Sequence, residues 1–335
     1  MKVLITGGAG YIGSHAAKAL AAAGHEGVVY DNLSTGHLWA VKWGPFEYGD
    51  IGDTTTLAGV MRRHGIEAVL HFAARSYVGE SAVRPDIYYR NNVSGSISVL
   101  DAMRAADVGK IVFSSTCSTY GARNAMPLVE GMPQAPINCY GRTKLMVEEI
   151  LGDYASAYGI APMVLRFFNA AGADPDGELG EEHVPETHLV PLILQAAAGM
   201  RPEIQLFGDD YPTTDGTCVR DYVHVTDLGA THLAALSRLV PGELQAYNLG
   251  SGTGYSVREM LAAAERITGR PVPVQIAPRR PGDPPRLVAD TAAAAAALGW
   301  SPRHSDLDTI IATTWAWMTE HRQNAYRALA NRGGA

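Results

Sequence analysis

The stretch Val3-Leu-Ile-Thr-Gly-Gly-Ala-Gly-Tyr-Ile-Gly-Ser14 joins a short apolar run to a glycine-rich loop. Val3–Thr6 is typical of a buried strand, and a helical pattern from Ser14 to Ala23 follows the loop. The loop fits Gly-x-Gly-x-x-Gly from Gly8, and glycines there permit a tight turn and close approach of the backbone to a pyrophosphate. The start of the following helix offers free N–H groups and a positive dipole end. Strand, loop and helix stand in the order that a dinucleotide-binding turn requires.

Short apolar runs and helical stretches alternate through the rest of the first half of the chain. The predicted strands are Val3–Thr6, Gly27–Tyr30, Ala68–Phe72, Lys110–Ser114 and Pro162–Arg166. The predicted helices between them are Ser14–Ala23, Thr54–His64, Asn91–Ala105 and Tyr140–Tyr158. This alternation predicts an α/β fold with a Rossmann-type, doubly wound parallel sheet.

The second half has a different texture, with long stretches rich in Gly, Pro and acidic residues after residue 170. We expect a dinucleotide-binding domain over 1–170 and a smaller mixed α/β substrate domain over 171–335. The helices predicted there are Leu189–Ala198, Val225–Leu239, Val257–Thr268, Ala292–Ala297 and Leu307–His321. The run Tyr247–Gly250 is predicted to return a strand to the first sheet, so the two domains are expected to interleave.

Asp31 follows the second predicted strand and identifies the dinucleotide. An acid at that place accepts the two hydroxyls of an adenosine ribose and repels a 2′-phosphate. Neither Arg nor Lys occurs between Asp31 and Thr35, so the sequence favours NAD over NADP. Without the glycine loop, Asp31 is equally compatible with a simple turn residue at the end of a strand.

The composition of the chain limits the classes of binding partner that we expect. The chain has 335 residues, a hydrophobic content of 47%, a charged content of 18% and a net charge of −7. No run of Lys and Arg occurs, so we expect neither a nucleic acid nor a membrane as partner. The first apolar run is too short for a signal segment or a membrane span. Cys117, Cys139 and Cys218 are odd in number and lack metal-ligand spacing, which favours a reduced, cytoplasmic setting.

One segment contains residues typical of a metal site. Glu181, Glu182 and His183 are followed by Glu186 and His188. Pro185 interrupts the segment, and its spacing is not the His-Glu-x-x-His of a zinc helix. We therefore expect no metal ion.

Tyr140 and Lys144 lie four residues apart in a predicted helix, so their side chains share one face. A Lys ammonium near a phenol favours the phenolate, which can act as a base. Thr116 ends the predicted strand Lys110–Thr116, at the edge of the sheet where ligands bind. A hydroxyl, a Tyr and a Lys beside a nicotinamide form a hydride-transfer site. By itself the pair is equally compatible with a half-buried tyrosine beside a solvated lysine.

Longer motifs extend this pattern along the chain. They are TGGAGYIGSH (6–15), YDNLSTGH (30–37), HFAA (71–74), SSTCSTYG (114–121), RFFNAAGADPDGELGE (166–181), DGTCVRDYVHVTDL (215–228), YNLGSGTGYSV (247–257) and PRRPGD (278–283). Together they resemble the extended short-chain dehydrogenase/reductases and, within them, the UDP-glucose (UDP-galactose) 4-epimerases. The resemblance covers residues 1 to about 320.

The resemblance implies a tightly held NAD and a set of contacts to it. Tyr140 would take the proton of the sugar 4-hydroxyl, Lys144 would hold the nicotinamide ribose, and Thr116 would bond the 4-oxygen. The implied cofactor contacts are Gly7, Gly10, Tyr11, Ile12, Gly13, Asp31, Asn32, Asp50, Ile51, Phe72, Ala73, Ala74, Asn91, Ser114, Tyr140, Lys144 and Phe168.

The resemblance also implies a UDP-sugar substrate, whose diphosphate two arginines would clamp. The implied substrate contacts are Ser76, Thr116, Asn169, His188, Leu189, Phe207, Arg220, Tyr222, Arg280 and Asp283. The implied reaction is reversible epimerisation at C4 through a 4-keto sugar. For each arginine, a surface ion pair remains the alternative.

Other activities stay open within this resemblance. A sugar-nucleotide 4,6-dehydratase would need an Asp-Glu pair after the active-site Thr, where this chain has Cys117-Ser118. UDP-xylose or UDP-arabinose and UDP-N-acetylglucosamine remain alternative substrates, since Leu287 does not settle the room at C2. A nucleotide-sensing protein without chemistry is a further alternative. The resemblance implies a homodimer formed through the helices Asn91–Ala105 and Tyr140–Tyr158.

Overall fold

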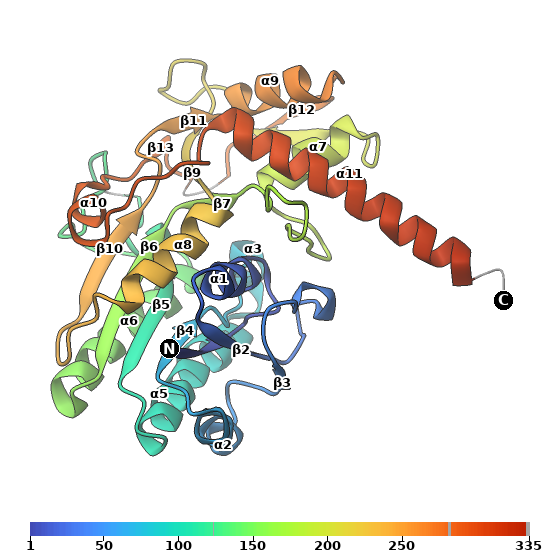
Figure 1. Cartoon of the computed structure of the whole chain (residues 1–335). Coiled ribbons are helices and arrows are strands. Elements are labelled where there is room, and N and C mark those ends of the chain that lie inside the picture. Colours follow the sequence, from blue (N-terminus) through green and yellow to red (C-terminus); the bar gives the residue numbers. More distant parts are fainter. Residues whose placement is uncertain (123, 281–282, 333–335) are drawn as a thin grey trace.

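A parallel sheet of seven strands forms the centre of the part that the computed structural model describes, residues 1–122, 124–280 and 283–332 (Figure 1). The strands are β1 (Lys2–Thr6), β2 (Glu26–Asp31), β3 (Phe46–Tyr48), β4 (Ala68–His71), β5 (Lys110–Thr116), β6 (Ala161–Phe167) and β10 (Gln245–Leu249). Their order is β10-β6-β5-β4-β1-β2-β3, and every pairing is parallel. The predicted Rossmann-type sheet is confirmed.

Helices cover both faces of this sheet. One face packs against α2 (Thr54–His64), α5 (Gly95–Ala105) and α6 (Cys139–Tyr158). The other face packs against α1 (Tyr11–Ala22), α8 (Val225–Leu236) and α10 (Ala292–Leu298). Because both faces are covered, the strands are apolar over most of their length, and β4 is buried at each of its residues.

The strand order reverses beside β1, which pairs with β2 on one side and β4 on the other. At such a point the two crossovers leave in opposite directions and open a crevice at the carboxyl ends of the strands. The glycine loop follows β1 at that edge, and Phe72–Ala74 follows β4. The fold alone therefore places these two segments side by side at the crevice.

The second half builds a smaller layer around two short sheets (Figure 1). The first has the order β11 (Gly254–Ser256), β9 (Val219–His224), β13 (Arg286–Leu287), and β7 (Asn169–Ala171) also pairs with β9. The second pairs β8 (Ile204–Phe207) with β12 (Val274–Ala277). The helices α7 (Leu189–Ala197), α9 (Val257–Thr268) and α11 (Leu307–Arg332) contribute to its apolar core.

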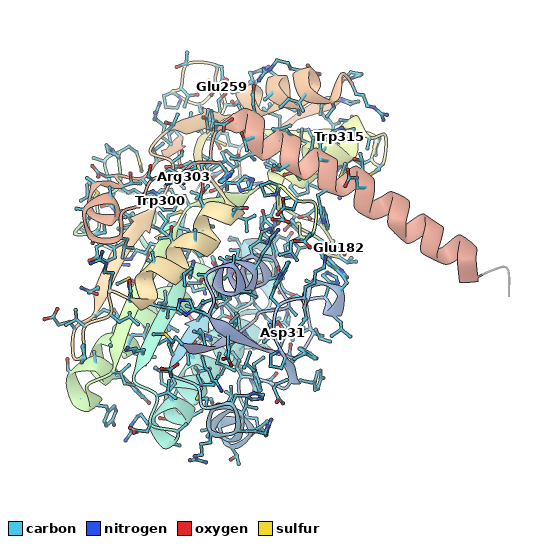
Figure 2. The ribbon with its side chains drawn as sticks, in the orientation of Figure 1. Asp31, Glu182, Glu259, Trp300, Arg303 and Trp315 are labelled. Carbon is cyan, nitrogen blue, oxygen red and sulfur yellow. The ribbon has the colours of Figure 1, made fainter. Side chains whose placement is uncertain are left out.

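A strand of the second half joins the first sheet, at the place where the sequence predicts a returning strand. β10 follows α8 and pairs in parallel with β6, which brings a late segment back to the first sheet. Trp300, labelled in Figure 2, donates from its indole nitrogen to the carbonyl of Gly250 at 2.9 Å, just after β10. The domain boundary at residue 170 stays a prediction.

One predicted helix differs in form. The segment expected as a helix from Asn91 begins as a π-helix, η2 (Tyr89–Ser94), before α5 continues it. The remaining short elements are η1 (Leu38–Ala40), α3 (Val78–Val83), α4 (Pro85–Tyr88) and η3 (Cys117–Thr119). A π-turn inside a helix is common at functional sites, and this one faces the crevice.

Candidate active site

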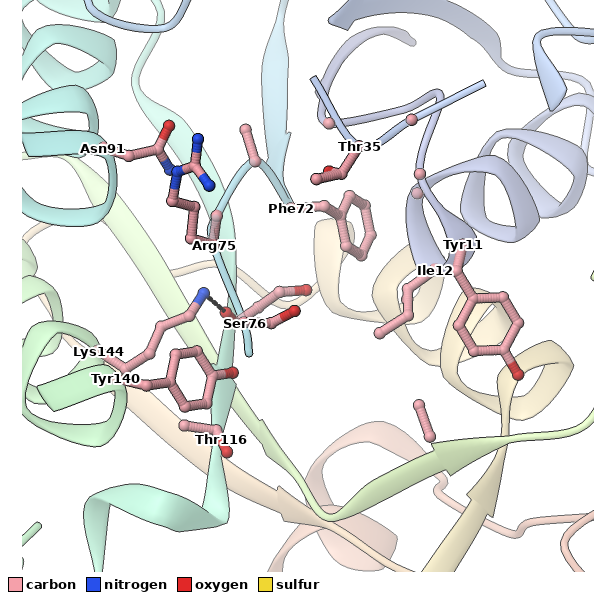
Figure 3. Close-up of a pocket in the computed structure, with 18 of the residues that line it drawn as sticks. Tyr11, Ile12, Thr35, Phe72, Arg75, Ser76, Asn91, Thr116, Tyr140 and Lys144 are labelled. Carbon is pink, nitrogen blue, oxygen red and sulfur yellow. Dashed lines mark hydrogen bonds between the residues drawn. The ribbon is translucent and has the colours of Figure 1, made fainter. Parts of the chain in front are cut away.

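A large pocket occupies the crevice and extends toward β7 (Figure 3). Of the residues expected at the cofactor, it is lined by Gly7, Gly10, Tyr11, Ile12, Gly13, Asp31, Asn32, Ile51, Phe72, Ala73, Ala74, Asn91, Ser114, Tyr140, Lys144 and Phe168. Of those expected at the substrate, it is lined by Ser76, Thr116, Asn169 and His188. The fold therefore gathers residues from distant parts of the sequence around one space.

The glycine loop has little room for side chains. Gly7 has a φ of +74°, and a Cβ there would lie 2.5 Å from the backbone nitrogen of Ala73. A Cβ on Gly13 would lie 2.3 Å from the carbonyl oxygen of Gly7. The loop therefore packs backbone on backbone at the start of α1, which is the cradle that a pyrophosphate requires.

Asp31 is buried at the end of β2 (Figure 2), where its carboxylate accepts hydrogen bonds from two backbone groups. Ala9 N lies 3.0 Å from Oδ2, and Leu33 N lies 2.8 Å from Oδ1. Burial raises its pKa, and these two hydrogen bonds oppose the rise. Asp50, also expected at the cofactor, is not among the residues that line the pocket; it accepts from Asn32 Nδ2 at 2.8 Å.

The π-helical turn η2 aims two asparagines at the pocket wall. Asn91 lines the pocket and donates to Asn92 Oδ1 at 2.9 Å. Asn92 is buried, accepts from Arg75 N at 2.8 Å and donates to Thr143 Oγ1 at 3.1 Å. The turn therefore ties the segment after β4 to α6, which carries Tyr140 and Lys144.

Thr116, Tyr140 and Lys144, which we call the Tyr–Lys corner, lie on one side of the pocket in Figure 3. All three are buried, although each reaches the pocket. Lys144 Nζ donates to the carbonyl of Ser114 at 2.7 Å and lies 4.6 Å from the centre of the Phe113 ring. These contacts hold Lys144 of α6 against β5.

The hydroxyl of Thr116 has a structural role as well. It accepts from Ser118 N at 3.1 Å and so caps the short helix η3. The same hydroxyl oxygen therefore caps a helix and belongs to a residue that lines the pocket.

Burial of the Tyr–Lys corner disfavours the charged forms of its side chains. Burial lowers the pKa of Lys144 to about 7, and the Glu148 carboxylate opposes this effect. Burial raises the pKa of Tyr140, which the Thr116 hydroxyl opposes. The sequence predicts a phenol whose pKa is lowered by Lys144, but in the chain alone burial outweighs that influence. Deprotonation of Tyr140 therefore needs further positive charge in the pocket.

A buried network that the sequence does not reveal supports this corner. Glu148, one turn beyond Lys144, accepts from Ser115 Oγ at 2.5 Å and from Arg166 Nη2 at 2.7 Å. Arg166 also donates to Tyr120 Oη at 2.9 Å. The network joins α6 to β5 and β6 beside Thr116.

Six of the predicted substrate residues are not among those that line the pocket: Leu189, Phe207, Arg220, Tyr222, Arg280 and Asp283. Four of them, Phe207, Arg220, Arg280 and Asp283, lie close to one another on and beside β8 and β9, and we call them the arginine end. Arg220 Nη2 donates to Asp283 Oδ1 at 2.5 Å, and the Arg280 guanidinium lies 3.9 Å from the centre of the Phe207 ring. Leu189 begins α7, and Tyr222 is buried in β9.

The pocket also has lining residues that the sequence does not single out as cofactor or substrate contacts. They are Tyr30, Ser34, Thr35, Gly36, Gly49, Arg75, Val78, Cys117, Ser118, Phe167, Ala170, Glu181 and His183. Thr35 and Arg75 appear in Figure 3 near the glycine loop and Asn91. The Ser34–Gly36 part belongs to the quoted YDNLSTGH motif, whose position after β2 was the available signal.

Glu181, His183, Glu186 and His188, which we call the histidine–glutamate cluster, meet in the loop between β7 and α7. Burial opposes charge on His183, but the carboxylates of Glu181 and Glu186 raise its pKa to about 9. Burial likewise opposes charge on His188, and the same two carboxylates raise its pKa to about 10. The structure therefore joins side chains that Pro185 separates in the sequence.

Two further features bear on the setting of the protein. Among the described residues, no helix combines the length and the apolar composition needed to cross a membrane. Cys117, Cys139 and Cys218 are all free thiols.

Fold and site together define a Rossmann-type protein of the short-chain dehydrogenase/reductase class. The chain belongs to the NAD dependent epimerase/dehydratase family, which its sequence matches over residues 3–250. It is 50% identical to the UDP-glucose 4-epimerase of Rhizobium meliloti over 96% of this chain and 98% of that protein.

Solved structures agree with this assignment. The UDP-glucose 4-epimerase of Brucella ovis in complex with NAD is 54% identical, with a TM-score of 0.91 over 94% of this chain and 97% of that one. The UDP-glucose-4-epimerase of Stenotrophomonas maltophila, with bound NAD and formylated UDP-arabinopyranose, is 42% identical. Its TM-score is 0.93 over 97% of this chain and 99% of that one.

Proposed function

We propose that the chain catalyses the NAD-dependent, reversible epimerisation of a UDP-hexose at C4, interconverting UDP-galactose and UDP-glucose through a transient 4-keto sugar. One observation carries the proposal. A buried tyrosine, lysine and threonine share a pocket with a glycine loop and a ribose-binding acid in a chain of the epimerase family. The same arrangement supports oxidation at one carbon followed by its reversal within a single site.

The residues at the pocket fit NAD. The side-chain-free glycine loop at the start of α1 would hold the pyrophosphate, and Asp31 would accept the adenosine ribose hydroxyls. Tyr140, Lys144 and Ser114 would surround the nicotinamide end. When bound, NAD⁺ supplies the hydride acceptor and a cationic ring.

Tyr140 acts as the base and Lys144 as its electrostatic partner. The phenolate would accept the proton of the sugar 4-hydroxyl, and it would return that proton when the keto group is reduced. Lys144 is held by the Ser114 carbonyl, so its ammonium keeps a fixed place in the pocket. The Thr116 hydroxyl would bond the 4-oxygen in both directions. Retention of the keto sugar requires that the nucleotide stay bound while the sugar turns.

Arg220 and Arg280 supply that anchorage. Guanidinium groups suit the paired oxygens of a diphosphate, and Asp283, which accepts from Arg220, would accept a hydroxyl of the uridine ribose or a neighbouring hydroxyl. Phe207 and Tyr222 would enclose the uracil end, and His188 and Leu189 would line the same region. Asn169 would lie near the UDP phosphates, and Ser76 would be a further substrate contact. Strong binding of the nucleotide combined with loose binding of the sugar lets the intermediate present either face.

A dehydratase does not fit this pocket as well. Cys117 and Ser118 line it directly after Thr116, at the places where a 4,6-dehydratase needs two carboxyl groups. UDP-pentoses remain a second substrate class, because the relative from Stenotrophomonas maltophila is described with a formylated UDP-arabinopyranose.

We further propose a cytoplasmic homodimer. Three free thiols fit a reducing compartment. A groove beside α6 is lined by the apolar residues Ile137, Leu145 and Met146 together with Arg142 and Glu149, and it lies on one of the two helices expected to form the dimer contact. Sedimentation at micromolar concentration tests the dimer, and a sharp monomer peak would contradict it.

The decisive experiment follows UDP-galactose by proton NMR with the purified chain. We expect UDP-glucose to appear without added cofactor and without loss of water from the sugar. NAD released by acid should equal the amount of chain. A panel of UDP-galactose, UDP-N-acetylgalactosamine and UDP-xylose then ranks the sugars. Bound NAD without turnover of any of the three would refute the enzymatic proposal.

A further inference from the structure

The loop between β7 and α7 gathers four side chains with ligating atoms at one point. They belong to the histidine–glutamate cluster, whose four ligating atoms all lie within 4.8 Å of one another. Glu181 Oε1 lies 2.7 Å from His188 Nδ1 and 3.3 Å from His183 Nδ1. We propose that this cluster binds a zinc ion. The proposal does not rest on the epimerisation proposed above, although His188 also lines the pocket that the substrate would occupy.

The separations between the ligating atoms match a tetrahedral site. Bonds of about 2.0–2.1 Å to a tetrahedral zinc place neighbouring ligand atoms about 3.3 Å apart. Glu186 Oε1 lies 3.3 Å from His188 Nδ1, and Glu186 Oε2 lies 3.8 Å from His183 Nδ1. With the Glu181 distances, the contacts span 2.7–3.8 Å around that value.

One atom of the cluster has ion-pair neighbours but no hydrogen bond within the protein. His183 Nδ1 is buried, lies between two carboxylates and makes no hydrogen bond with either. A buried polar atom without a partner costs stability unless something bonds it. A metal ion at the centre of the cluster would satisfy His183 Nδ1.

The donor set selects the ion. Two imidazole nitrogens and two carboxylate oxygens suit zinc and similar divalent transition metals, whereas calcium and magnesium prefer oxygen ligands alone. Two carboxylates also balance the charge of a divalent ion, which a buried site requires. Their side chains are only 3% and 7% exposed, so water does little to screen them.

A neighbouring acidic cluster shows the contrast. Asp174, Asp176 and Glu178 also converge, but Lys18 Nζ lies among them at 2.7–2.8 Å. An ammonium group already supplies the cation there. At Glu181 and Glu186, the ion pairs found in the described part of the chain come from His183 and His188, whose imidazoles, unlike the Lys18 ammonium, can release a proton and bind a metal ion through the freed nitrogen.

The surrounding contacts hold the ligands in place. The backbone N–H groups of Thr187 and His188 donate to Glu186 Oε1 at 2.7 and 2.9 Å. Such contacts fix the orientation of a ligating carboxylate. Glu182 (Figure 2) points elsewhere and accepts from Trp39 Nε1 at 3.1 Å. Zinc would therefore fasten the start of α7, where His188 lines the pocket.

The test uses the full chain, purified without a metal-binding tag or chelator. Elemental analysis should find about one zinc per chain, as expected for a four-ligand site. After chelation, added zinc should raise the melting temperature, and cobalt should give the visible absorption bands of a tetrahedral site. Fewer than about 0.1 zinc per chain together with no thermal shift would overturn the proposal, because a four-ligand site retains its ion.

Variants localise the ion. His183→Ala should weaken zinc binding at least about tenfold in a competition titration, since it removes one ligand. Glu186→Gln keeps the shape of the side chain and should weaken binding as well. His64→Ala is the matched control, because His64 Nε2 pairs with Glu47 Oε1 at 2.6 Å outside the cluster. Equal zinc affinity in His183→Ala and His64→Ala would refute the site even if zinc binds elsewhere.

Discussion

The Tyr–Lys corner and the arginine end treat buried charge in opposite ways. Lys144 is 3% exposed and donates to a neutral carbonyl, so burial lowers its pKa to about 7. Arg220 is 8% exposed but pairs with Asp283, and although burial opposes its charge, that carboxylate raises its pKa. An ionisable group kept without a countercharge is available for chemistry. A self-paired group must exchange its partner when a diphosphate binds.

The comparison predicts two kinds of kinetic defect in variants, a lower kcat and a higher KM. Changes in the Tyr–Lys corner should lower kcat, because its groups are proposed to act on the atoms that react. Changes in the arginine end should raise KM, because its groups are proposed to hold a part of the substrate that does not react.

Tyr140→Phe should give the largest effect. Removing the phenol oxygen deletes the proposed base, so kcat should fall on the order of 10³-fold or more while bound NAD stays stoichiometric. Tyr154→Phe is the control on the same helix. The Tyr154 hydroxyl donates to Asp101 Oδ1 at 3.0 Å, and Tyr154 is not among the residues that line the pocket. NMR of UDP-galactose turnover measures both variants. Wild-type turnover in Tyr140→Phe would remove it from the mechanism.

The next largest effect is expected at the buried ion pair of Arg166 and Glu148, which supports the Tyr–Lys corner. Arg166→Met leaves Glu148 buried without its partner, so the free energy of unfolding should fall by about 3–5 kcal/mol. The double variant Arg166→Met/Glu148→Leu should recover most of that loss. Urea titration at an unchanged slope measures both.

An exposed pair provides the control for this stability prediction. Arg266→Met breaks a surface contact with Asp308 and should change the unfolding free energy by about 0.5 kcal/mol or less. If Arg166→Met also falls within that range, the network does not hold α6 against the sheet.

The sequence predicts best those elements whose ends carry their own signals. α2 and α9 match their predicted bounds. Asp53 caps α2 and a glycine ends it; Ser256 and Glu259 form a capping box on α9. β3 was missed because three residues give no periodic pattern. The π-turn of η2 was missed because local residues do not distinguish it from an α-helix.

Parts of the site were not predicted from the sequence, for a related reason. The glycine loop, Asp31 and the Tyr–Lys pair are local patterns, and the structure places all of them at one pocket. Glu148 and Arg166 lie on separate elements and meet only when α6 packs on β6. The histidine–glutamate cluster was set aside because its linear spacing fits no known zinc pattern. The loop brings its ligands together by folding back, which spacing cannot reveal.

Arg220→Ala tests the arginine end directly. Loss of a charge-assisted contact to the diphosphate should raise KM roughly 10- to 100-fold and change kcat by a few-fold at most. Arg279→Ala is the matched control, since Arg279 is half exposed and pairs with Asp210 at 2.6 Å. An unchanged KM for Arg220→Ala, or an equal rise for both variants, would remove Arg220 from the diphosphate site.

The pH dependence of stability tests the Tyr–Lys corner through an effect that is small for each pH unit. The pKa of Lys144 is lowered from 10.5 in the unfolded chain to about 7 in the folded one. Between these values the unfolded chain binds more protons, so this lysine makes stability rise with pH there and imposes its full cost below about pH 7. In that window, the free energy of unfolding of the NAD-free wild type should rise relative to that of Lys144→Met by up to about 1.4 kcal/mol per pH unit. Lys110→Met, at an exposed position on β5, should run parallel to wild type. Parallel unfolding curves for Lys144→Met would show that the ammonium stays charged in the fold, and the contrast with Arg220 would then disappear.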